Sequence, residues 1–406
     1  MTKHRKTSIR FCLRKSLEPN SPNMENVLTV IDLFAGIGGF SLGFVNASDA
    51  AYQCRFELRL LVDYDPTAIY TFKKNFPNIP FWPKDLINAQ GSDILKLAKL
   101  KTGELDFLVG GPPCQGFSSS GKRWLEDNRN RLISRFIDLA HQIRPKCAII
   151  ENVPMALSAY ERIFSEEIQE TFKGYIVKAT VLNASQFGVP QIRRRAFIVA
   201  LRDDLGISQF GFPKGDYDPV EVGNDMHKKA KSHQHFVSVG EAIGDLPPLK
   251  AGQSVDGEPY ARPAESKYQE ARRKGAIAVF NHTARSHSKE FLKKIGPIRP
   301  GMGNSDLPDG ERFSDNYYSQ AYARLHAKGI GFTITANFRN PGSGRFTHYR
   351  DKRSITVREA ARLQSFDDRF IFHGSEADQE RHVGNAVPPL LSQSLATHFG
   401  SLVSSA

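Results

Sequence analysis

The sequence predicts an α/β protein with a mixed, mostly parallel sheet and helices on both sheet faces, followed by a smaller irregular domain. Two observations support this prediction. Up to about residue 204, β-branched apolar runs alternate with stretches of helical periodicity, which is typical of βαβ units. From about residue 205 to about residue 350, Pro, Gly, Asp, Lys and His dominate and long periodic runs are few.

The elements follow in chain order. The apolar runs predicted to be strands span residues 27–34, 58–62, 105–109, 147–150, 177–182 and 196–201. Residues 131–143 have the apolar spacing of an amphipathic helix. Asp65 followed by Pro66 predicts a helix start, with Asp as the N-cap and Pro at the first helical position. Two more helices are expected near the C-terminus, over residues 357–364 and 385–401.

These elements divide the chain into four parts. Residues 1–26 are expected to form a basic, disordered tail, because six Lys and Arg oppose two Glu and apolar residues are few. Residues 27–204 form the first domain and residues 205–350 the second. Residues 351–406 are expected to return to the first domain and complete it.

Composition narrows the class of protein. The 55 Lys and Arg against 43 Asp and Glu give a net charge of +12, as expected of a nucleic-acid-binding protein, although a merely soluble basic protein fits equally well. No apolar run approaches the roughly 18 residues that span a bilayer, so no membrane association is expected. The four cysteines form no CxxC pair, which argues against a disulfide scaffold and a zinc site. We therefore expect a cytoplasmic, metal-free protein with free thiols.

A glycine-rich turn follows the first predicted strand, in the run DLFAGIGGF of residues 32–40. Glycines at such a turn let the backbone approach a ligand closely. The third glycine of the dinucleotide-binding GxGxxG pattern is missing. Asp63, at the end of the next strand, is placed to bind ribose hydroxyls. Taken alone, this run is equally consistent with an ordinary tight turn.

A cysteine lies directly after the third predicted strand, in the run GGPPCQGFS of residues 110–118. Open α/β sheets bind their ligands at the carboxyl ends of the strands, so Cys114 is the strongest candidate for a reactive thiol. Cys147 lies within an apolar run and is expected to be an inert core residue.

Charged residues follow two further strands. Glu151 ends the strand over residues 147–150 and could enter the same cleft as Cys114, although a solvated carboxylate is the simpler interpretation. Arg193 and Arg195 alternate along a strand and are expected to face the cleft together, with Arg194 on the opposite side. A charged strand edge is the alternative interpretation.

Together with the runs ITVREAARLQSF (355–366) and GNAVPP (384–389), these motifs resemble the DNA (cytosine-5) methyltransferase family, of the bacterial restriction-modification type. The resemblance covers roughly residues 27–400. It implies a Rossmann-like, S-adenosylmethionine-dependent methyltransferase domain and makes the basic region over residues 205–350 a target-recognition domain. Two residues depart from the family pattern. Asp63 stands where Glu is usual, and Asp367 stands where Pro is common.

The resemblance also implies a mechanism. Cys114 would add to C6 of a flipped-out cytosine in double-stranded DNA, Glu151 would contact N3, and Arg193 and Arg195 would lie near O2 and the phosphate. The methyl group would come from S-adenosylmethionine without a metal, and the product would be protected from a cognate restriction enzyme. The residues expected to bind the cofactor are Phe34, Gly36, Gly38, Asp63, Asp85, Pro113 and Asn385. Arg339, Arg345 and Arg350 are candidates for DNA contacts, and a monomer is expected.

Three alternatives remain open from the sequence. An RNA cytosine-5 methyltransferase would share the cofactor loop and the cysteine, but the large segment after Arg195 favours a DNA reader. A non-catalytic DNA-binding module would not need Cys114 and Glu151. A nicotinamide-dependent dehydrogenase would require the missing third glycine.

Overall fold

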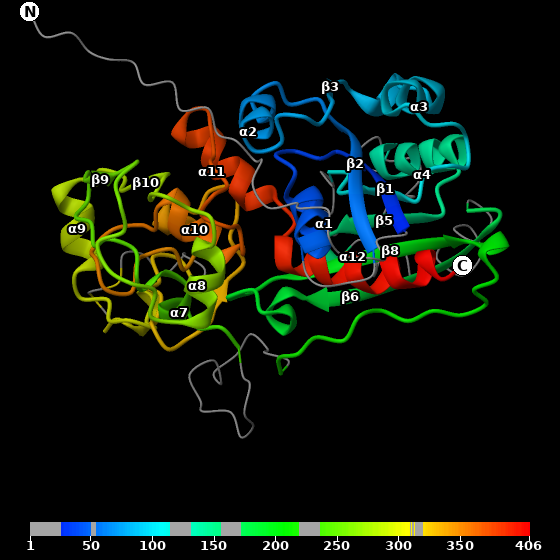
Figure 1. Ribbon diagram of the computed structural model, residues 1–406. Helices are drawn as coiled ribbons and strands as arrows, with labels where there is room; N and C mark the ends of the chain where they lie inside the picture. The colour runs from blue at the N-terminus through cyan, green and yellow to red at the C-terminus, as the bar shows by residue number, and fades with distance from the viewer. Residues whose placement is uncertain are drawn as a thin grey trace, which may run out of the picture.

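The computed structural model describes residues 26–49, 54–113, 131–155, 172–218, 236–308, 310, 312 and 320–406. Within these residues the chain forms two lobes (Figure 1). The larger lobe is built on a central sheet, and the smaller one consists of short elements joined by long loops.

The sheet of the larger lobe has seven strands in the order β3-β2-β1-β4-β5-β8-β6. The first five are parallel, whereas β8 runs antiparallel to both β5 and β6. The prediction of a mixed, mostly parallel sheet is therefore confirmed. The strand bounds are β1 Asn26–Leu33, β2 Cys54–Asp63, β3 Phe81–Pro83, β4 Phe107–Gly110, β5 Cys147–Asn152, β6 Tyr175–Asn183 and β8 Arg194–Arg202.

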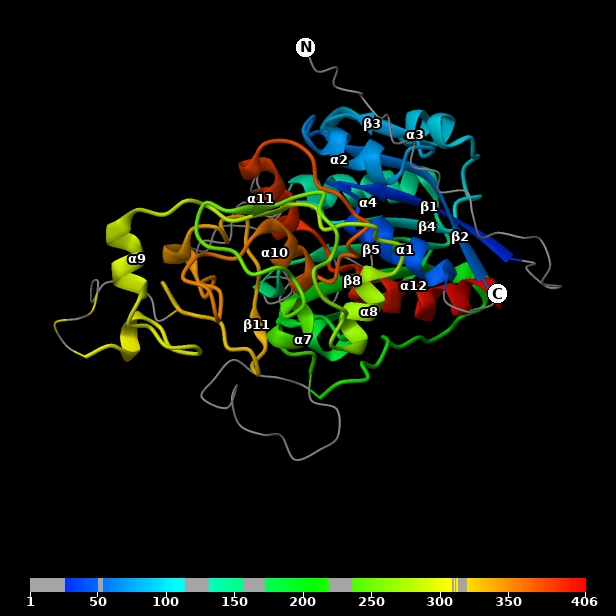
Figure 2. The ribbon, with the colours of Figure 1, turned by 60° about the vertical axis from the view of Figure 1, so that its left-hand side comes forward.

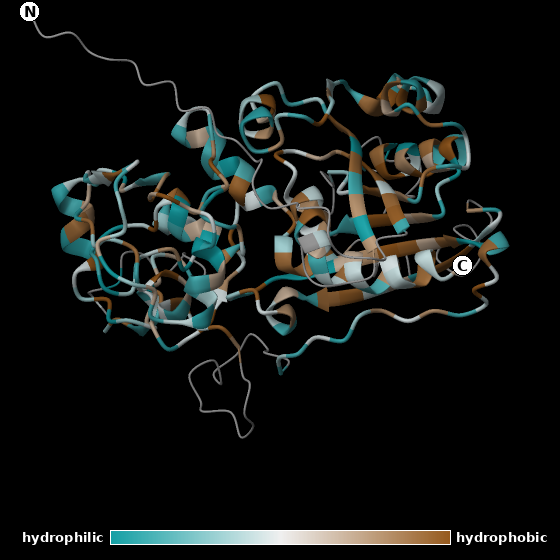
Figure 3. Cartoon of the chain, in the orientation of Figure 1, coloured by the Kyte–Doolittle hydropathy of each residue, from teal (hydrophilic) through white to brown (hydrophobic). Residues whose placement is uncertain are grey.

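Helices cover both faces of this sheet. Alternate residues of β1 point to opposite faces, so Val30 belongs to one apolar cluster and Ile31 to the other. The cluster of Val30 includes α1 (Gly39–Asp49) and α12 (Pro389–Ser404), which lie side by side in Figures 1 and 2. The cluster of Ile31 includes α3 (Gly91–Ala98) and α4 (Arg131–Ile143). The sheet strands between these layers are mostly apolar (Figure 3).

The last helix completes the first lobe by packing closely on the first helix. A Cβ atom at Gly43 of α1 would lie 2.4 Å from Cβ of Ser392 in α12, so only glycine permits this approach. The Ser392 hydroxyl also donates a hydrogen bond to the Phe40 carbonyl, at 2.6 Å. The C-terminal helix of the chain therefore belongs to the first lobe.

The helix after β2 begins later than expected. α2 spans Ala68–Asn75, and its N-cap is Thr67 rather than Asp65. The Asp65 carboxylate instead accepts hydrogen bonds from the backbone N–H of Thr67, at 2.9 Å, and from its hydroxyl, at 2.7 Å. Asp65 therefore closes a turn before the helix, which is a common use of an Asp side chain.

The smaller lobe contains few regular elements. Their bounds are α7 Val239–Ile243, β9 Ser254–Val255, α8 Lys267–Arg273, β10 His282–Thr283, α9 Lys289–Ile295, β11 Gly331–Phe332 and α10 Val357–Leu363. Buried ion pairs join them. Arg362 of α10 contacts Asp245, at 3.1 Å, and Asp368, at 2.6 Å, and the side chains of all three residues are fully buried.

The boundaries of this lobe differ from those expected at residues 205 and 350. Phe210 and Phe212 pack on Phe399 of α12, so the segment just after residue 205 lies on the larger lobe. α10 lies in the smaller lobe, where Arg362 donates to the carbonyl of Ala242, at 2.7 Å. Among the described residues, the smaller lobe therefore runs from about residue 236 to about residue 372. The chain then returns through α11 (Glu376–Asn385), which lies between the lobes in Figure 1.

In the part of the chain that the structure describes, no helix has both the length and the apolar character needed to cross a bilayer. The same residues contain no cluster of His, Cys, Asp or Glu suited to hold a metal ion.

Candidate active site

The glycine-rich turn after β1 has an unusual backbone conformation. Phe34, Gly36 and Gly38 all have positive φ, at 56°, 52° and 85°. A Cβ atom at Gly38 would lie 2.9 Å from the Phe76 ring, whereas one at Gly36 would meet nothing within 4 Å. Gly38 is therefore required by conformation and by packing. At Gly36 the conformation favours glycine, and the open space leaves the backbone accessible to a ligand.

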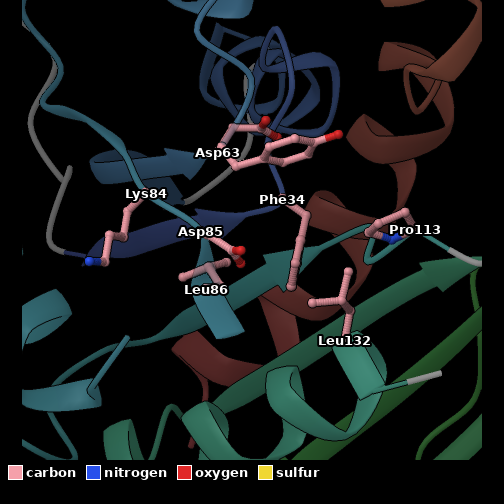
Figure 4. A pocket seen from close by; sticks show the side chains of 8 residues that line it. Phe34, Asp63, Lys84, Asp85, Leu86, Pro113 and Leu132 are labelled. Carbon is pink, nitrogen blue, oxygen red and sulfur yellow. The ribbon is translucent and has the colours of Figure 1, made fainter. Parts of the chain in front are cut away.

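A pocket opens beside this turn at the carboxyl ends of β1 and β2 (Figure 4). Its empty volume is about 250 Å³, part of which is open to solvent. Four of the predicted cofactor residues line it together: Phe34, Asp63, Asp85 and Pro113. Four further residues complete the lining: Tyr64, Lys84, Leu86 and Leu132.

Backbone N–H groups hold both carboxylates of the pocket. Asp63 accepts a hydrogen bond on Oδ2 from Gly36, at 2.7 Å, and on Oδ1 from Asp65, at 2.8 Å. Burial raises the pKa of Asp63, and the two N–H groups act in the opposite direction. Asp85 accepts from the N–H of Ile87, at 2.9 Å, at the start of a short 3-10 helix. Each carboxylate therefore has a fixed direction and retains lone pairs for a ligand.

The ends of β5 and β8 bring Glu151 and Arg195 together. Arg195 Nε lies 2.9 Å from Glu151 Oε1, and the two side chains are only 15% and 12% exposed. A Cβ atom at Gly111 would lie 3.1 Å from Glu151 Oε2, so the loop after β4 passes directly beside this carboxylate. Asn152 anchors the same loop by donating from Nδ2 to the Pro112 carbonyl, at 3.2 Å.

Cys114 lies outside the described residues, one position after Pro113. The structure therefore places the approach to Cys114 beside Glu151, but it does not describe the thiol itself. Cys147 is fully buried in the core, and burial raises the pKa of its thiol well above the ordinary value. The prediction that Cys147 is an inert core residue agrees with this position.

The expectation that Arg193 faces the cleft beside Arg195 is corrected by the structure. The Arg193 side chain is buried, and its guanidinium donates to the carbonyls of Ile334, Gly384 and Ala386, at 2.9, 3.0 and 3.2 Å. Arg193 lies between β7 (Gln191–Ile192) and β8, where its backbone N–H bonds Asn183 Oδ1 instead of continuing the strand. This break directs its side chain into the contact between the lobes.

Other predicted residues also lie away from the pocket. Asn385 is exposed at the end of α11 and does not line it. Arg339 and Arg345, proposed from the sequence for DNA contacts, are buried. Arg339 bonds Glu376, at 2.7 Å, and Arg345 bonds backbone carbonyls, so neither is available to a phosphate in this structure. Arg350 is partly exposed and pairs with Asp351, at 2.9 Å.

Comparison with known proteins identifies the family. Residues 28–401 match the C-5 cytosine-specific DNA methylase family. The chain belongs to this family. It is 33% identical over 374 residues to Type II methyltransferase M1.HphI of Haemophilus parahaemolyticus, covering 91% of this chain and 86% of that protein. It is also 33% identical to Type II methyltransferase M.DdeI of Desulfomicrobium norvegicum, covering 91% and 88%.

A solved structure supports the same assignment. A prophage-encoded protein of E. coli, described as a DNA modification methyltransferase, matches with a TM-score of 0.69 and 26% identity, covering 93% of this chain and 99% of that one. The resemblance to DNA (cytosine-5) methyltransferases is thus confirmed, and the chain is an enzyme of that class.

Five residues of this methyltransferase site were not predicted from the sequence: Tyr64, Lys84, Leu86, Leu132 and Asn152. Tyr64 directly follows Asp63 at the end of β2 and lines the pocket, although two-thirds of the residue is exposed. An aromatic residue next to the predicted ribose carboxylate was a signal that could have identified it. Asn152 directly follows Glu151, but its role as the anchor of the 110–113 loop requires the fold to be known.

Proposed function

We propose that this enzyme transfers a methyl group from S-adenosylmethionine to C5 of a cytosine flipped out of a specific double-stranded DNA sequence. The reaction proceeds through a covalent bond between Cys114 and C6 of the base, and the product is protected from a cognate restriction enzyme. The observation that carries this proposal is the Glu151–Arg195 pair beside the loop that leads to Cys114, next to a pocket that holds two carboxylates.

The pocket residues fit S-adenosylmethionine chemically. Two carboxylates suit a ligand with a sulfonium cation, ribose hydroxyls and an exocyclic amine, and the rings of Phe34 and Tyr64 suit a flat heterocycle. We assign the ribose to Asp63, the adenine amine to Asp85, and the open backbone at Gly36 to close contact with the ligand. When bound, the cofactor supplies a methyl carbon that is attacked as an electrophile.

The protein side chains carry the remaining steps. The Cys114 thiolate forms a bond to C6, and the electrons of the C5–C6 double bond make C5 nucleophilic. Glu151 contacts N3, while Arg195 stabilises the negative charge that develops toward O2. After C5 is methylated, loss of the C5 proton restores the double bond and releases the Cys114 thiolate. Arg193 contributes by holding the segment over residues 384–386.

The smaller lobe is proposed to read the DNA sequence. A site that holds one flipped base cannot also contact several neighbouring base pairs, so a second surface is required. With Arg339 and Arg345 buried, the exposed Lys289 and Lys293 of α9 are better candidates for phosphate contacts.

Trapping with a fluorinated base tests the reaction. Bisulfite sequencing of DNA from cells that express the protein first identifies the methylated site. A duplex with 5-fluorocytosine at that position should then form a denaturant-stable adduct that requires S-adenosylmethionine, because the fluorine cannot leave as a cation. Cys114→Ser should abolish the adduct, and Glu151→Gln should slow its formation. Methylation without any adduct, or an adduct that maps to Cys147, would overturn the mechanism.

A further inference from the structure

A short turn connects the cofactor pocket to the helix between the lobes. Asp63 at the end of β2 lines the pocket, and its Oδ1 atom accepts the backbone N–H of Asp65, at 2.8 Å. The direction of that N–H depends on the conformation of residues 63–67. The orientation of the pocket carboxylate therefore depends on what holds Asp65.

The side chain of Asp65 is held from two directions. Its Oδ1 atom accepts the N–H and the hydroxyl of Thr67, at 2.9 and 2.7 Å, which closes the turn. Its Oδ2 atom accepts Arg381 Nη1 and His382 Nε2 of α11, the latter at 3.1 Å. These contacts lower the pKa of Asp65 against the opposing effect of its burial, so the carboxylate is ionised at neutral pH.

His382 takes part in this contact in its neutral form. It is only 5% exposed, and burial lowers its pKa. Asp65 raises the pKa in part. Of the other charged groups that face the ring, Arg381 lowers the pKa and Asp378 raises it. Its Nδ1 atom is buried without a hydrogen-bond partner among the described residues. We therefore assign the ring proton to Nε2, which lies 3.1 Å from both Asp65 Oδ2 and Thr67 Oγ1 and donates to the carboxylate.

The end of α11 is fixed on its other side as well. Arg193 donates to the carbonyls of Gly384 and Ala386. A Cβ atom at Gly384 would lie 2.3 Å from the backbone carbonyl carbon of Thr335, so α11 meets the smaller lobe here without space for a side chain. The contact of Asp65 with α11 thus connects the pocket carboxylate of Asp63 to the end of α11, which is already fixed to both lobes.

We propose that Asp65, Arg381 and His382 form a positioning unit. Through this unit, the helix between the lobes sets the orientation of Asp63, the protein carboxylate that lines the cofactor pocket. Asp65 does not touch the cofactor. Its backbone N–H donates to Asp63 and so orients that carboxylate. Because Asp63 also accepts the Gly36 N–H, the effect extends to the glycine-rich turn. The inference rests on the proposed function in one respect, namely that the pocket beside Asp63 binds S-adenosylmethionine.

Calorimetric binding of S-adenosylhomocysteine to the DNA-free enzyme tests the unit without relying on activity. Asp65→Asn keeps an acceptor for Thr67 but removes the charge that holds Arg381 and His382. It should weaken binding about tenfold, within the range typical of coupled sites. The matched control is Asp378→Asn, which also removes a partner of Arg381, bonded at 3.0 Å, but has no contact with the 63–67 turn among its described hydrogen bonds. It should bind within about twofold of the wild type.

A second pair of variants separates positioning from folding. His382→Gln keeps an N–H donor near the position of Nε2 and should retain binding, whereas His382→Leu should weaken it. Methylation kinetics should show a raised KM for S-adenosylmethionine and a nearly unchanged kcat in Asp65→Asn, because the loss is in binding. Equal affinity in Asp65→Asn and Asp378→Asn, or in the two His382 variants, would overturn the positioning unit. A wild-type enzyme that does not bind S-adenosylhomocysteine would instead overturn the proposed function.

Discussion

Arg195→Met removes the cation beside Glu151 and keeps most of the side-chain volume. The pair is 2.9 Å apart, with side chains 15% and 12% exposed, so water compensates little for the lost partner. Removing one partner of a fully buried pair costs about 3–5 kcal/mol, and the residual exposure here places the stability cost nearer to about 2 kcal/mol. In catalysis, losing a group that stabilises developing negative charge lowers kcat by about 10²–10³-fold. We therefore expect a folded enzyme with a large loss of kcat.

The assay is the initial rate of radiolabelled methyl transfer at saturating cofactor and DNA, with thermal unfolding measured in parallel. Combining Arg195→Met with Glu151→Gln forms a double-mutant cycle. Because the two side chains contact each other, the loss of activity in the double variant should be smaller than the sum of the two single losses. Expressed as activation free energies, the difference should be about 1–3 kcal/mol. Calorimetric binding of S-adenosylhomocysteine should change little, because neither residue lines the cofactor pocket.

Arg194 supplies the matched control. It is the adjacent residue of β8 and is exposed. The hydrogen bond from Arg195 to residue 194 reaches its backbone carbonyl, so Arg194→Met leaves that bond intact. A catalytic role for the Glu151–Arg195 pair is refuted if Arg195→Met keeps kcat within tenfold of the wild type, if Arg194→Met is equally impaired, or if the two effects in the cycle are additive.

Two further predictions concern stability. Burial lowers the pKa of His348 from 6.5 to about 4, and its Nδ1 atom accepts the N–H groups of Arg350 and Asp351, so the folded state requires a neutral ring. This stabilisation is complete above about pH 6.5 and is lost as the pH falls toward 4, at a cost of about 3 kcal/mol. Urea unfolding at several pH values should show the free energy of unfolding falling over this range, and His348→Gln should make that fall smaller. Gly384→Ala should destabilise the protein by about 1–3 kcal/mol, because its Cβ would lie 2.3 Å from the Thr335 backbone; an unchanged melting temperature would contradict this.

The sheet was largely predictable from the sequence because most of its strands are buried, although β6 is only partly buried along most of its length. Continuous apolar runs identify such strands, and each of the runs predicted as strands overlaps a strand of the sheet. β3 has only three residues, Phe81–Pro83, and is half-exposed, so it carries no periodic signal. α3 was also missed, although half of its eight residues are buried. Elements this short depend on their neighbours rather than on their own pattern.

The extent of the smaller lobe could not be predicted, because charged residues form part of its interior. Arg353 lies just before α10, and Arg358 and Arg362 lie within it, yet all three charged side chains are fully buried. Some of their partners are near in the chain, such as Glu359 for Arg353 and Asp368 for Arg362. Others are distant: Arg362 also contacts Asp245, and Arg353 also donates to the carbonyl of Leu249. Pairing of this kind makes a buried arginine tolerable, and no local pattern reveals it. The same reason explains why Arg193 was expected to face the cleft and why Arg339 and Arg345 were expected to contact DNA.

Asp367 shows how a departure from the family pattern acquires a physical role. Its Oδ1 atom lies 3.0 Å from Arg272 of α8, and its Oδ2 atom accepts Asn46 Nδ2 of α1, at 3.2 Å. Proline, common at this position, has no carboxylate and could make neither contact. Asp367 therefore joins the smaller lobe to α1 of the larger lobe. This connection is separate from the contact between Asp65 and α11. With Arg193 as a third connection, the lobes are fixed at separate points, so their relative position is set by side chains that local sequence patterns do not pair.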